Sequence, residues 1–350
     1  MFNNVVRKLV FTGGHHTSAL VVAKELQKKG WKILWFGHKH SMWADKSDSA
    51  EYREVTSAGI KFYDLHAGKF HRTFNPLKLA RIPFGFLQSF WWLFKERPRG
   101  IVSFGGYLAV PTVIAGWILG IPAVTHEQTV TRGWANRVIG IFASKIALSW
   151  ESSRKFYPSN KSEVVGLPVR PEILSMLSEK TGKNSKPVIY VTGGKQGSQT
   201  INEVVFSSLS MLARYHIIHQ TGNLDYQKAL SLESPVYEVF DFDSKKAVSS
   251  MYRADVVVSR AGAHTVYELG LLGKKCVLIP IPWVSHQEQE KNAQMLVDAG
   301  NAVILSESQL SSETLLASIE EASKLKPSKL ALPTDARSQM VSLIESVFGK

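Results

Sequence analysis

Residues 254–272 read ADVVVSRAGAHTVYELGLL, and this stretch predicts a strand, a tight turn and a helix in succession. Asp255 to Ser259 is a short β-branched run typical of a buried parallel strand. Arg260 to Ala263 is a tight turn, and the helix is expected to open near His264 or Thr265. The stretch therefore predicts one β-α unit of a parallel sheet.

The turn in this stretch can bind an anion. The first backbone N–H groups of a helix have no partner within the helix and carry the positive end of its dipole. A phosphate could therefore rest on Gly262 and Ala263, where no large side chain blocks its approach. Glu268 could then hold the two hydroxyls of a ribose, which suggests a nucleotide-sugar site. An ordinary β-α unit with a surface glutamate is the alternative, because short glycine motifs often occur by chance.

The composition is typical of a globular protein from a reducing compartment. The 350 residues suffice for two domains, and 44% of them are hydrophobic against 20% charged. Cys276 is the single cysteine, so the sequence excludes a disulfide framework. No secretory signal is visible, since the apolar run from Val5 to Phe11 is short and contains Arg7 and Lys8.

The net charge of +13 is confined to the first half of the chain. Residues 1–165 hold 23 Lys and Arg against 10 Asp and Glu, whereas residues 166–350 hold 19 against 19. This asymmetry suggests that the first half faces a polyanion, either nucleic acid or an anionic membrane surface.

The uncharged stretch from Ile101 to Thr125 has the length of a membrane span. Gly105, Gly106, Pro111 and Pro122 nevertheless divide it into strand, loop, helix and strand. A buried α/β segment is favoured over a membrane span, because a break exposed to lipid would leave backbone groups unpaired.

Residues 69–99 combine cations with a block of aromatic residues. Six aromatic residues lie between Phe84 and Phe94, and Lys, Arg and His residues flank them on both sides. One interpretation is an interfacial patch, in which the aromatics enter the headgroup region and the cations meet anionic lipid. The other is a core helix with a solvated basic face. Nucleic acid ranks lower, because the aromatics do not alternate with cations as a base-stacking groove requires.

The first 37 residues predict the opening of a doubly wound α/β domain. A strand from Arg7 to Phe11, a glycine loop, a helix from Thr17 to Lys29 and a strand from Trp31 to Gly37 follow one another. Ligands of such domains bind at the carboxyl ends of the strands. Gly13 and Gly14 place bare N–H groups at such an end, immediately before a helix.

Two further loops of the first half are site candidates because each follows a predicted strand. The first is Gly105-Gly106-Tyr107. The second, His126-Glu127-Gln128, comes after a predicted strand from Ala123 to Thr125. For His126, a hydrogen-bonded structural histidine is an equally good interpretation.

The Pro- and Gly-rich segment 164–171 marks the expected boundary between two domains, and the charge balance changes there. A second β-α series follows, with predicted strands from Val188 to Thr192, His216 to Gln220 and Tyr237 to Phe240. A glycine loop from Gly193 to Ser198 and a helix from Gln199 to Arg214 come after the first of them. The loop Asp241-Phe242-Asp243 could bind a divalent cation that holds a diphosphate. The metal is not favoured, because two helix N-termini and Arg170 can already neutralise the phosphates.

Together these motifs resemble the MurG family of glycosyltransferases over nearly the whole chain. In order, they are TGGH at 12–15, FGGY at 104–107, GIPAVTHEQ at 120–128, VVGLPVR at 164–170, VTGGKQG at 191–197, HQTG at 219–222, ADVVVSRAGAHTVYEL at 254–269 and the HQ…NA run at 286–293. The resemblance implies an α/β fold of two doubly wound Rossmann-like domains, the GT-B type, with a cleft between them. Residues 1–165 with a C-terminal helix at 334–350 would face the acceptor and the membrane, and residues 166–333 would bind the donor.

The resemblance also implies an activity. It is an inverting transfer of N-acetylglucosamine from UDP-N-acetylglucosamine to the lipid-linked muramoyl-pentapeptide of peptidoglycan synthesis (lipid I, giving lipid II), without a metal or another cofactor. The enzyme would be peripheral on the cytoplasmic face of the membrane, bound to anionic lipid through residues 69–99 and not to nucleic acid.

The resemblance assigns roles residue by residue. His15 is the expected general base, since imidazole titrates near neutral pH, and Glu127 is the other catalytic candidate. The expected donor-binding residues are Arg170, Gly193, Gly194, Lys195, Gln196, Gly197, Phe242, Gly262, Ala263, Glu268, Gln287 and Gln289, with the choice between the last two left open. The expected acceptor-binding residues are Gly13, Gly14, Gly105, Gly106, Tyr107, His126 and Gln128.

The chain departs from the family pattern at three places. Val10 and Phe11 replace a glycine pair, Thr129 replaces the usual Asn after HEQ, and Lys195 replaces a Ser. A cation at Lys195 is favourable beside a diphosphate. A related enzyme that uses diacylglycerol as acceptor, a UDP-sugar 2-epimerase and a non-catalytic nucleotide-sugar-binding subunit remain as alternatives.

Overall fold

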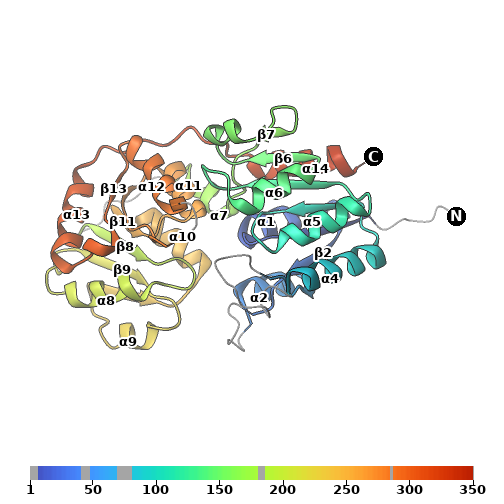
Figure 1. The fold of residues 1–350 in the computed structure, drawn as a ribbon. Coiled ribbons are helices and arrows are strands. Elements are labelled where there is room, and N and C mark those ends of the chain that lie inside the picture. The colour runs from blue at the N-terminus through green and yellow to red at the C-terminus, as the bar shows by residue number, and fades with distance from the viewer. Residues whose placement is uncertain (1–6, 41–47, 69–80, 180–185, 284–286, 350) are drawn as a thin grey trace. The chain divides into compact units, whose positions relative to one another are not determined.

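The computed structural model describes residues 7–40, 48–68, 81–179, 186–283 and 287–349. The chain forms two compact units, which Figure 1 shows as ribbons. The first unit contains Met1–Arg170 and Pro333–Lys350, and the second contains Pro171–Leu332. The first boundary thus follows Arg170, whereas the sequence-based expectation placed it after residue 165.

Hydrogen bonds explain why the boundary lies later than expected. The backbone N–H groups of Val165 and Gly166 both donate to the carbonyl oxygen of Leu148, at 3.0 and 3.1 Å. The hydroxyl of Ser18 donates to the carbonyl oxygen of Pro168 at 2.8 Å. The Pro- and Gly-rich segment is therefore held by the first unit almost to its end.

The first unit is built on a parallel sheet of seven strands. They are β1 (Lys8–Thr12), β2 (Lys32–Gly37), β3 (Lys61–Asp64), β4 (Gly100–Ser103), β5 (Ala123–Glu127), β6 (Lys145–Leu148) and β7 (Ser162–Val164). Their order in the sheet is β3-β2-β1-β4-β5-β6-β7. The direction of winding reverses between β1 and β4, and ligands of open parallel sheets bind at such a switch point.

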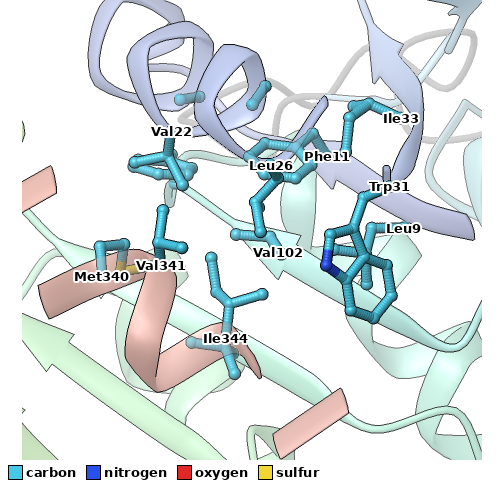
Figure 2. Packing of buried hydrophobic residues seen from close by; sticks show 14 of the residues in the cluster. Leu9, Phe11, Val22, Leu26, Trp31, Ile33, Val102, Met340, Val341 and Ile344 are labelled. Carbon is cyan, nitrogen blue, oxygen red and sulfur yellow. The ribbon is translucent and has the colours of Figure 1, made fainter. Parts of the chain in front are cut away.

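The helices of this unit cover both faces of the sheet, and the C-terminal helix packs against the first helix of the chain. The helices are α1 (His16–Lys28), α2 (Ala50–Ser57), α4 (Arg81–Glu96), α5 (Ala109–Ile118), α6 (Trp134–Phe142), the 3-10 helix η1 (Glu151–Phe156) and α14 (Ala336–Phe348). Figure 2 shows Met340, Val341 and Ile344 of α14 packed with Val22 and Leu26 of α1, over side chains of the sheet. The C-terminal helix thus completes the core of the first unit.

The uncharged stretch 101–125 folds as predicted, as part of β4, α5 and β5. Strand β5 is longer than expected and includes His126 and Glu127, which pair with Ala147 and Leu148 of β6. The expectation that these two polar residues follow the strand is therefore wrong. In the part of the chain that the structure describes, no helix combines the length and the apolar character needed to cross a membrane.

The second unit is built on a parallel sheet of six strands. They are β8 (Val188–Thr192), β9 (His216–Gln220), β10 (Tyr237–Phe240), β11 (Val256–Ser259), β12 (Lys275–Leu278) and β13 (Ala302–Ile304), in the order β10-β9-β8-β11-β12-β13. The helices are α7 (Pro171–Met176), α8 (Gln199–Ser208), α9 (Tyr226–Leu230), α10 (Ser244–Arg253), α11 (Ala263–Leu272), α12 (Glu288–Asp298), the 3-10 helix η3 (Glu307–Gln309) and α13 (Ser312–Lys324). The predicted α/β class with two parallel sheets is confirmed.

The stretch 254–272 forms β11, a turn and α11. Asp255 lies just before the strand, and its carboxylate accepts a hydrogen bond from the N–H of Val188 at 2.7 Å. Helix α11 begins at Ala263, slightly earlier than expected, and Gly273 ends it with a left-handed φ of 62°. The switch point of this sheet lies between β8 and β11, so the loop after β11 faces the loop after β8.

Candidate active site

The loops that follow β1 and β4 meet at the switch point of the first unit. The N–H of Gly14 donates to the carbonyl oxygen of Gly105 at 3.0 Å. Gly13 has a φ of 134°, and a Cβ there would lie 2.7 Å from the backbone carbon of Phe104. A Cβ on Gly106 would lie 3.0 Å from the N atom of Gly14. Only glycines allow the two loops to approach this closely.

His15 lies at the start of α1, beside these loops, and is uncharged at neutral pH. Burial, with a smaller effect of His16, lowers the pKa of His15 to about 4, so the expectation that this imidazole titrates near neutral pH is wrong. Burial also lowers the pKa of His126 to about 4, and the charge of nearby His15 contributes. The Nε2 atom of His126 lies 2.9 Å from the carbonyl oxygen of Gly166 and must donate to it, so Nδ1 is unprotonated.

The carboxylate of Glu127 is held by three residues. It accepts hydrogen bonds from the N–H and the hydroxyl of Thr129 at 3.2 and 3.0 Å, the side-chain amide of Asn136 at 2.9 Å and the hydroxyl of Tyr157 at 2.7 Å. Burial raises the pKa of Glu127, and these hydrogen bonds oppose the rise. Asn136 also lies directly beneath Gly105, where an added Cβ would be 2.9 Å from its amide. Glu127 thus holds Asn136 in place beneath the glycine loop at Gly105.

Two other expected acceptor residues lie at the same edge of the sheet. Gln128 is buried, and neither polar atom of its side chain finds a partner within the described residues. The backbone carbonyl oxygen of Gln128 accepts a hydrogen bond from the indole of Trp150 at 3.1 Å. Tyr107 is half-buried next to Gly106, and burial raises the pKa of its hydroxyl.

The glycine loop of the second unit, residues 193–197, follows β8 and leads into α8. The N–H of Gly197 donates to the carbonyl oxygen of Gly194 at 3.0 Å, which closes a tight turn. Gly194 and Gly197 have φ values of 89° and 76°. A Cβ on Gly197 would lie 1.8 Å from the carbonyl oxygen of Thr221, so this position accepts only glycine. Gln196 is exposed at the tip of the turn.

The N-terminus of α11 is bare, as the sequence predicts. Gly262 is its N-cap residue, no side chain caps the helix, and a Cβ on Gly262 would have no atom of the described residues within 4 Å. Ala263 is the first helical residue. Glu268 lies further along the same helix and is only 2% exposed. The geometry fits an anion at the helix end and a polar group at Glu268.

The structure distinguishes the two glutamines that the sequence left open. The side-chain oxygen of Gln289 accepts hydrogen bonds from the N–H groups of Ala261 and Ile281, at 3.2 and 3.1 Å. These bonds fix Gln289 beside the turn before α11 and leave its amide N–H groups to donate elsewhere. Gln287 is exposed and has a left-handed φ of 53° before α12.

Lys195 and Phe242 lie together in the second unit, next to the glycine loop. The ammonium nitrogen of Lys195 is 5.5 Å from the centre of the Phe242 ring, within the range of a cation–π interaction. The lysine that replaces the usual serine of the motif thus adds a positive charge at the glycine turn. Arg170, which the resemblance also assigns to the donor, belongs to the first unit and is the last residue before the second unit begins.

Models of one enzyme family match both halves of the chain. The glycosyltransferase family 28 N-terminal domain matches residues 11–148, and the C-terminal domain of the same family matches residues 188–347. The chain is also 33% identical to a Clostridium perfringens protein over 91% of this chain and 90% of the relative. The chain belongs to glycosyltransferase family 28. The relative is named UDP-N-acetylglucosamine--N-acetylmuramyl-(pentapeptide) pyrophosphoryl-undecaprenol N-acetylglucosamine transferase, and the predicted resemblance to the MurG family is confirmed.

Solved structures share the fold of this family 28 chain. A crystal structure of Acinetobacter baumannii MurG is 24% identical and covers 97% of this chain and 99% of its own, with a TM-score of 0.74. The UDP-GlcNAc 2-epimerase of Neisseria meningitidis is 14% identical and covers 97% of this chain and 100% of its own, with a TM-score of 0.61. The fold alone therefore does not separate transferases from epimerases.

Arg260 is a charged residue of this family 28 site that the sequence analysis did not identify as functional. Arg260 is buried just after β11, forms an ion pair with Glu307 and donates to the hydroxyl of Ser198 at 2.8 Å. It also donates to the carbonyl oxygen of Ile279 at 3.1 Å. These bonds hold the start of α8 next to the turn before α11. The sequence pattern that could have identified Arg260 is a charged residue directly after a buried apolar strand.

Proposed function

We propose that the chain is an inverting transferase that moves N-acetylglucosamine from UDP-N-acetylglucosamine to the lipid-linked muramoyl-pentapeptide, giving lipid II. The observation that carries the proposal is the bare N-terminus of α11, with open space at Gly262, next to the glycine turn at 193–197. Two helix N-termini beside each other suit a diphosphate. The acceptor is inferred from the name of the Clostridium perfringens relative that matches along 91% of the chain.

Each part of the donor would have its own residues. The diphosphate would lie on the backbone at Gly262 and Ala263 and on the glycine turn, with positive charge from Lys195. Arg170 keeps the donor role that the family resemblance gives it. The amide of Gln289 is positioned to donate to a sugar hydroxyl, since its oxygen is already occupied. Glu268 would bind the ribose, and Phe242 would flank the uracil. The glycine turn that meets the diphosphate is formed by Gly193, Gly194, Gln196 and Gly197. Gln287 would lie at the outer rim of the donor site.

In the proposed reaction His15 is the general base. The acceptor hydroxyl oxygen attacks the anomeric carbon from the face opposite UDP, so the configuration inverts. Its proton passes to the imidazole of His15, and the bond to the diphosphate oxygen breaks with both electrons leaving on UDP. Helix N-termini and cations stabilise the departing charge, so the proposed mechanism uses no metal.

Glu127 has a supporting role in this proposal. Both of its carboxylate oxygens already accept hydrogen bonds, whereas the base must take a proton from the acceptor. We therefore assign Glu127 to the placement of Asn136 and the loop at Gly105. Gly13, Gly106 and Tyr107 would then offer backbone and hydroxyl donors to the acceptor diphosphate. Gly14 would hold the loop beside it through its bond to Gly105, with His126 and Gln128 nearby.

Replacing Gly262 with alanine should weaken UDP binding at least about tenfold, because the new methyl group occupies the space proposed for the diphosphate. The fold should be unaffected, since Gly262 has an ordinary φ of −65° and the methyl group meets no atom of the described residues. Calorimetric titration with UDP measures the affinity, and thermal unfolding measures the stability.

Gly133→Ala is the matched control. Gly133 is also an N-cap residue, at the start of α6, with a φ of −66° and open space around it. This variant should bind UDP as the parent does. If the Gly262→Ala variant binds UDP with the affinity of the parent protein, the N-terminus of α11 is not part of the donor site.

The first unit also carries a face suited to a membrane surface. Phe84, Leu87, Trp91 and Phe94 of α4 recur at helical spacing and are each between 51% and 62% exposed. Helix α4 packs beside α5, and α5 beside α6, as Figure 1 shows. These neighbours add four further exposed side chains, Trp117, Ile118, Trp134 and Ile141. Such an apolar face favours the interfacial interpretation over a core helix.

Cations border this face. The guanidinium of Arg97 lies 5.9 Å from the centre of the Phe94 ring, and that of Arg137 lies 5.3 Å from the centre of the Trp134 ring. Cations beside aromatics attract anionic lipid, so we propose a peripheral enzyme on the cytoplasmic face of the membrane, without a nucleic-acid partner. Residues 69–80 of the predicted patch lie outside the described residues.

The double variant Leu87→Glu and Trp91→Glu should bind vesicles that contain phosphatidylglycerol at least about tenfold more weakly, because it removes two apolar side chains from the interface and adds negative charge. Vesicle sedimentation measures the partition. The control is Leu224→Glu, which alters an 81% exposed leucine of the second unit and should change nothing. Unchanged partition of the double variant would contradict the membrane assignment and leave the donor assignment intact.

A further inference from the structure

The end of β9 and the turn that follows it, residues 219–222, pack against the glycine turn at 193–197. Gln220 is the last residue of β9, and its side chain is buried. Its amide nitrogen donates to the carbonyl oxygen of Gly194 at 2.7 Å. Gln220 lies in the HQTG motif at 219–222, and the family resemblance assigns it no role.

The orientation of the Gln220 amide is fixed by Tyr190. The hydroxyl of Tyr190, in the neighbouring strand β8, lies 2.8 Å from the side-chain oxygen of Gln220 and donates to it. The opposite orientation would place two oxygens, those of Gln220 and Gly194, against each other. Tyr190 is itself held in place, because it is buried and its ring stacks on Phe240 with an interplanar angle of 4°.

The bond from Gln220 determines where the next amide points. In a planar trans peptide, the C=O and N–H groups point in opposite directions. The carbonyl of Gly194 points toward Gln220, so the N–H of Lys195 points away from it, to the outer side of the turn. This is the group that an anion on the turn would meet first.

A second set of hydrogen bonds holds residues 219–222, which pack against the glycine turn. The amide nitrogen of Asn202 donates to the carbonyl oxygen of Thr221 at 2.9 Å and to Asp225 at 2.7 Å. Its oxygen must then accept from Nε2 of His219, at 3.0 Å, so Nδ1 of His219 accepts from the hydroxyl of Tyr237, at 2.8 Å. Burial lowers the pKa of His219 to about 3, which agrees with this neutral form.

We propose that Gln220 is a positioning residue of the donor site: it fixes the Gly194–Lys195 peptide so that the Lys195 N–H faces the diphosphate of the nucleotide sugar. The inference rests on the donor site proposed above. Gln220 acts through the backbone and does not touch the substrate. Tyr190 orients Gln220 and therefore acts at one step further from the ligand.

Gln220→Met keeps the size of the side chain and deletes the donor, and Tyr190→Phe keeps the ring and deletes the hydroxyl. Gln220→Met should raise the KM for UDP-N-acetylglucosamine and the Kd for UDP about tenfold, with kcat within about twofold, because the bond is made in the ground state as well as in the transition state. Tyr190→Phe should raise both constants about threefold, and this effect should vanish in the Gln220→Met background, since Tyr190 acts through Gln220.

The control is Ser208→Ala, which deletes a buried hydroxyl of α8 that bonds the carbonyl of Val204 and does not contact the turn. It should leave KM and kcat unchanged. Unchanged KM and Kd in Gln220→Met, or additive effects in the double variant, would overturn the inference. If Gln220→Met does not fold, an unchanged KM in Tyr190→Phe overturns it. If the parent protein does not bind UDP at all, the proposed donor site itself fails, which is a distinct outcome.

Discussion

Replacing His15 with alanine is expected to lower kcat by about 10²- to 10⁴-fold, because a positioned general base contributes a factor of that size. UDP binding should remain within about twofold, since the proposed donor groups at 193–197 and 260–263 lie in the other unit. Steady-state transfer rates and calorimetric titration with UDP measure the two quantities. His16→Ala is the control, because His16 starts the same helix and instead pairs with Glu54 at 3.3 Å.

The pH dependence of the rate tests the same assignment. A general base must be unprotonated, and the pKa of His15 is about 4 against an ordinary value of 6.5. Protonation of His15 should therefore not reduce the rate between pH 7 and about pH 5. Because the pKa is lower in the folded state, this group also makes folding less favourable as the pH falls from 6.5 toward 4. A His15-dependent loss of rate near pH 6.5 would contradict the lowered pKa, and a His15→Ala enzyme as fast as its parent would contradict the general-base assignment.

Gly197→Ala is expected to destabilise the second unit by about 3 kcal/mol or more, since a non-glycine residue at positive φ and an overpacked site each cost about 1–3 kcal/mol. The new Cβ would lie 1.8 Å from the carbonyl oxygen of Thr221, so the two turns would have to separate. UDP binding should be lost when the two turns separate. Urea unfolding followed by circular dichroism measures the stability.

Gly194→Ala separates the two contributions. Gly194 has a similar positive φ of 89°, but an added Cβ would meet nothing within 4 Å in the described residues. Only the backbone cost remains, about 1–2 kcal/mol. If the two variants lose equal stability, the close packing of the turns does not contribute, and the proposed support from the β9 turn is wrong.

The sequence predicts the strands of the second unit well, for a physical reason. Val188–Thr192, His216–Gln220 and Tyr237–Phe240 are short apolar or β-branched runs bounded by turn residues, and the structure gives them the same bounds. Helix ends are less certain. Helix α8 was expected to continue to Arg214 but ends at Ser208, whose hydroxyl bonds the carbonyl of Val204 and competes with the helical pattern.

The glycine loops were also predictable, because the glycine pairs at 13–14, 105–106 and 193–194 each follow a predicted buried strand. The groups that hold them were not. Tyr157 and Asn136 contact Glu127 from 30 and 9 residues away in sequence, and Arg260 reaches Ser198 across 62 residues. Such pairs follow no period, so they become visible only when the sheet order is known. The exposure of Trp117 and Trp134 likewise depends on the packing of α5 and α6.

The central claim is transfer from UDP-N-acetylglucosamine to a lipid-linked muramoyl acceptor, and a transfer assay tests it most directly. The full chain would be given UDP-N-acetylglucosamine with a short-chain lipid-linked muramoyl-pentapeptide and, in parallel, with diacylglycerol, while epimerised UDP-sugar is monitored. Glu268→Ala is the control for the donor site. We predict product on the muramoyl acceptor alone, lost in Glu268→Ala. Product on diacylglycerol, formation of the epimerised UDP-sugar, or UDP binding without any product would contradict the account.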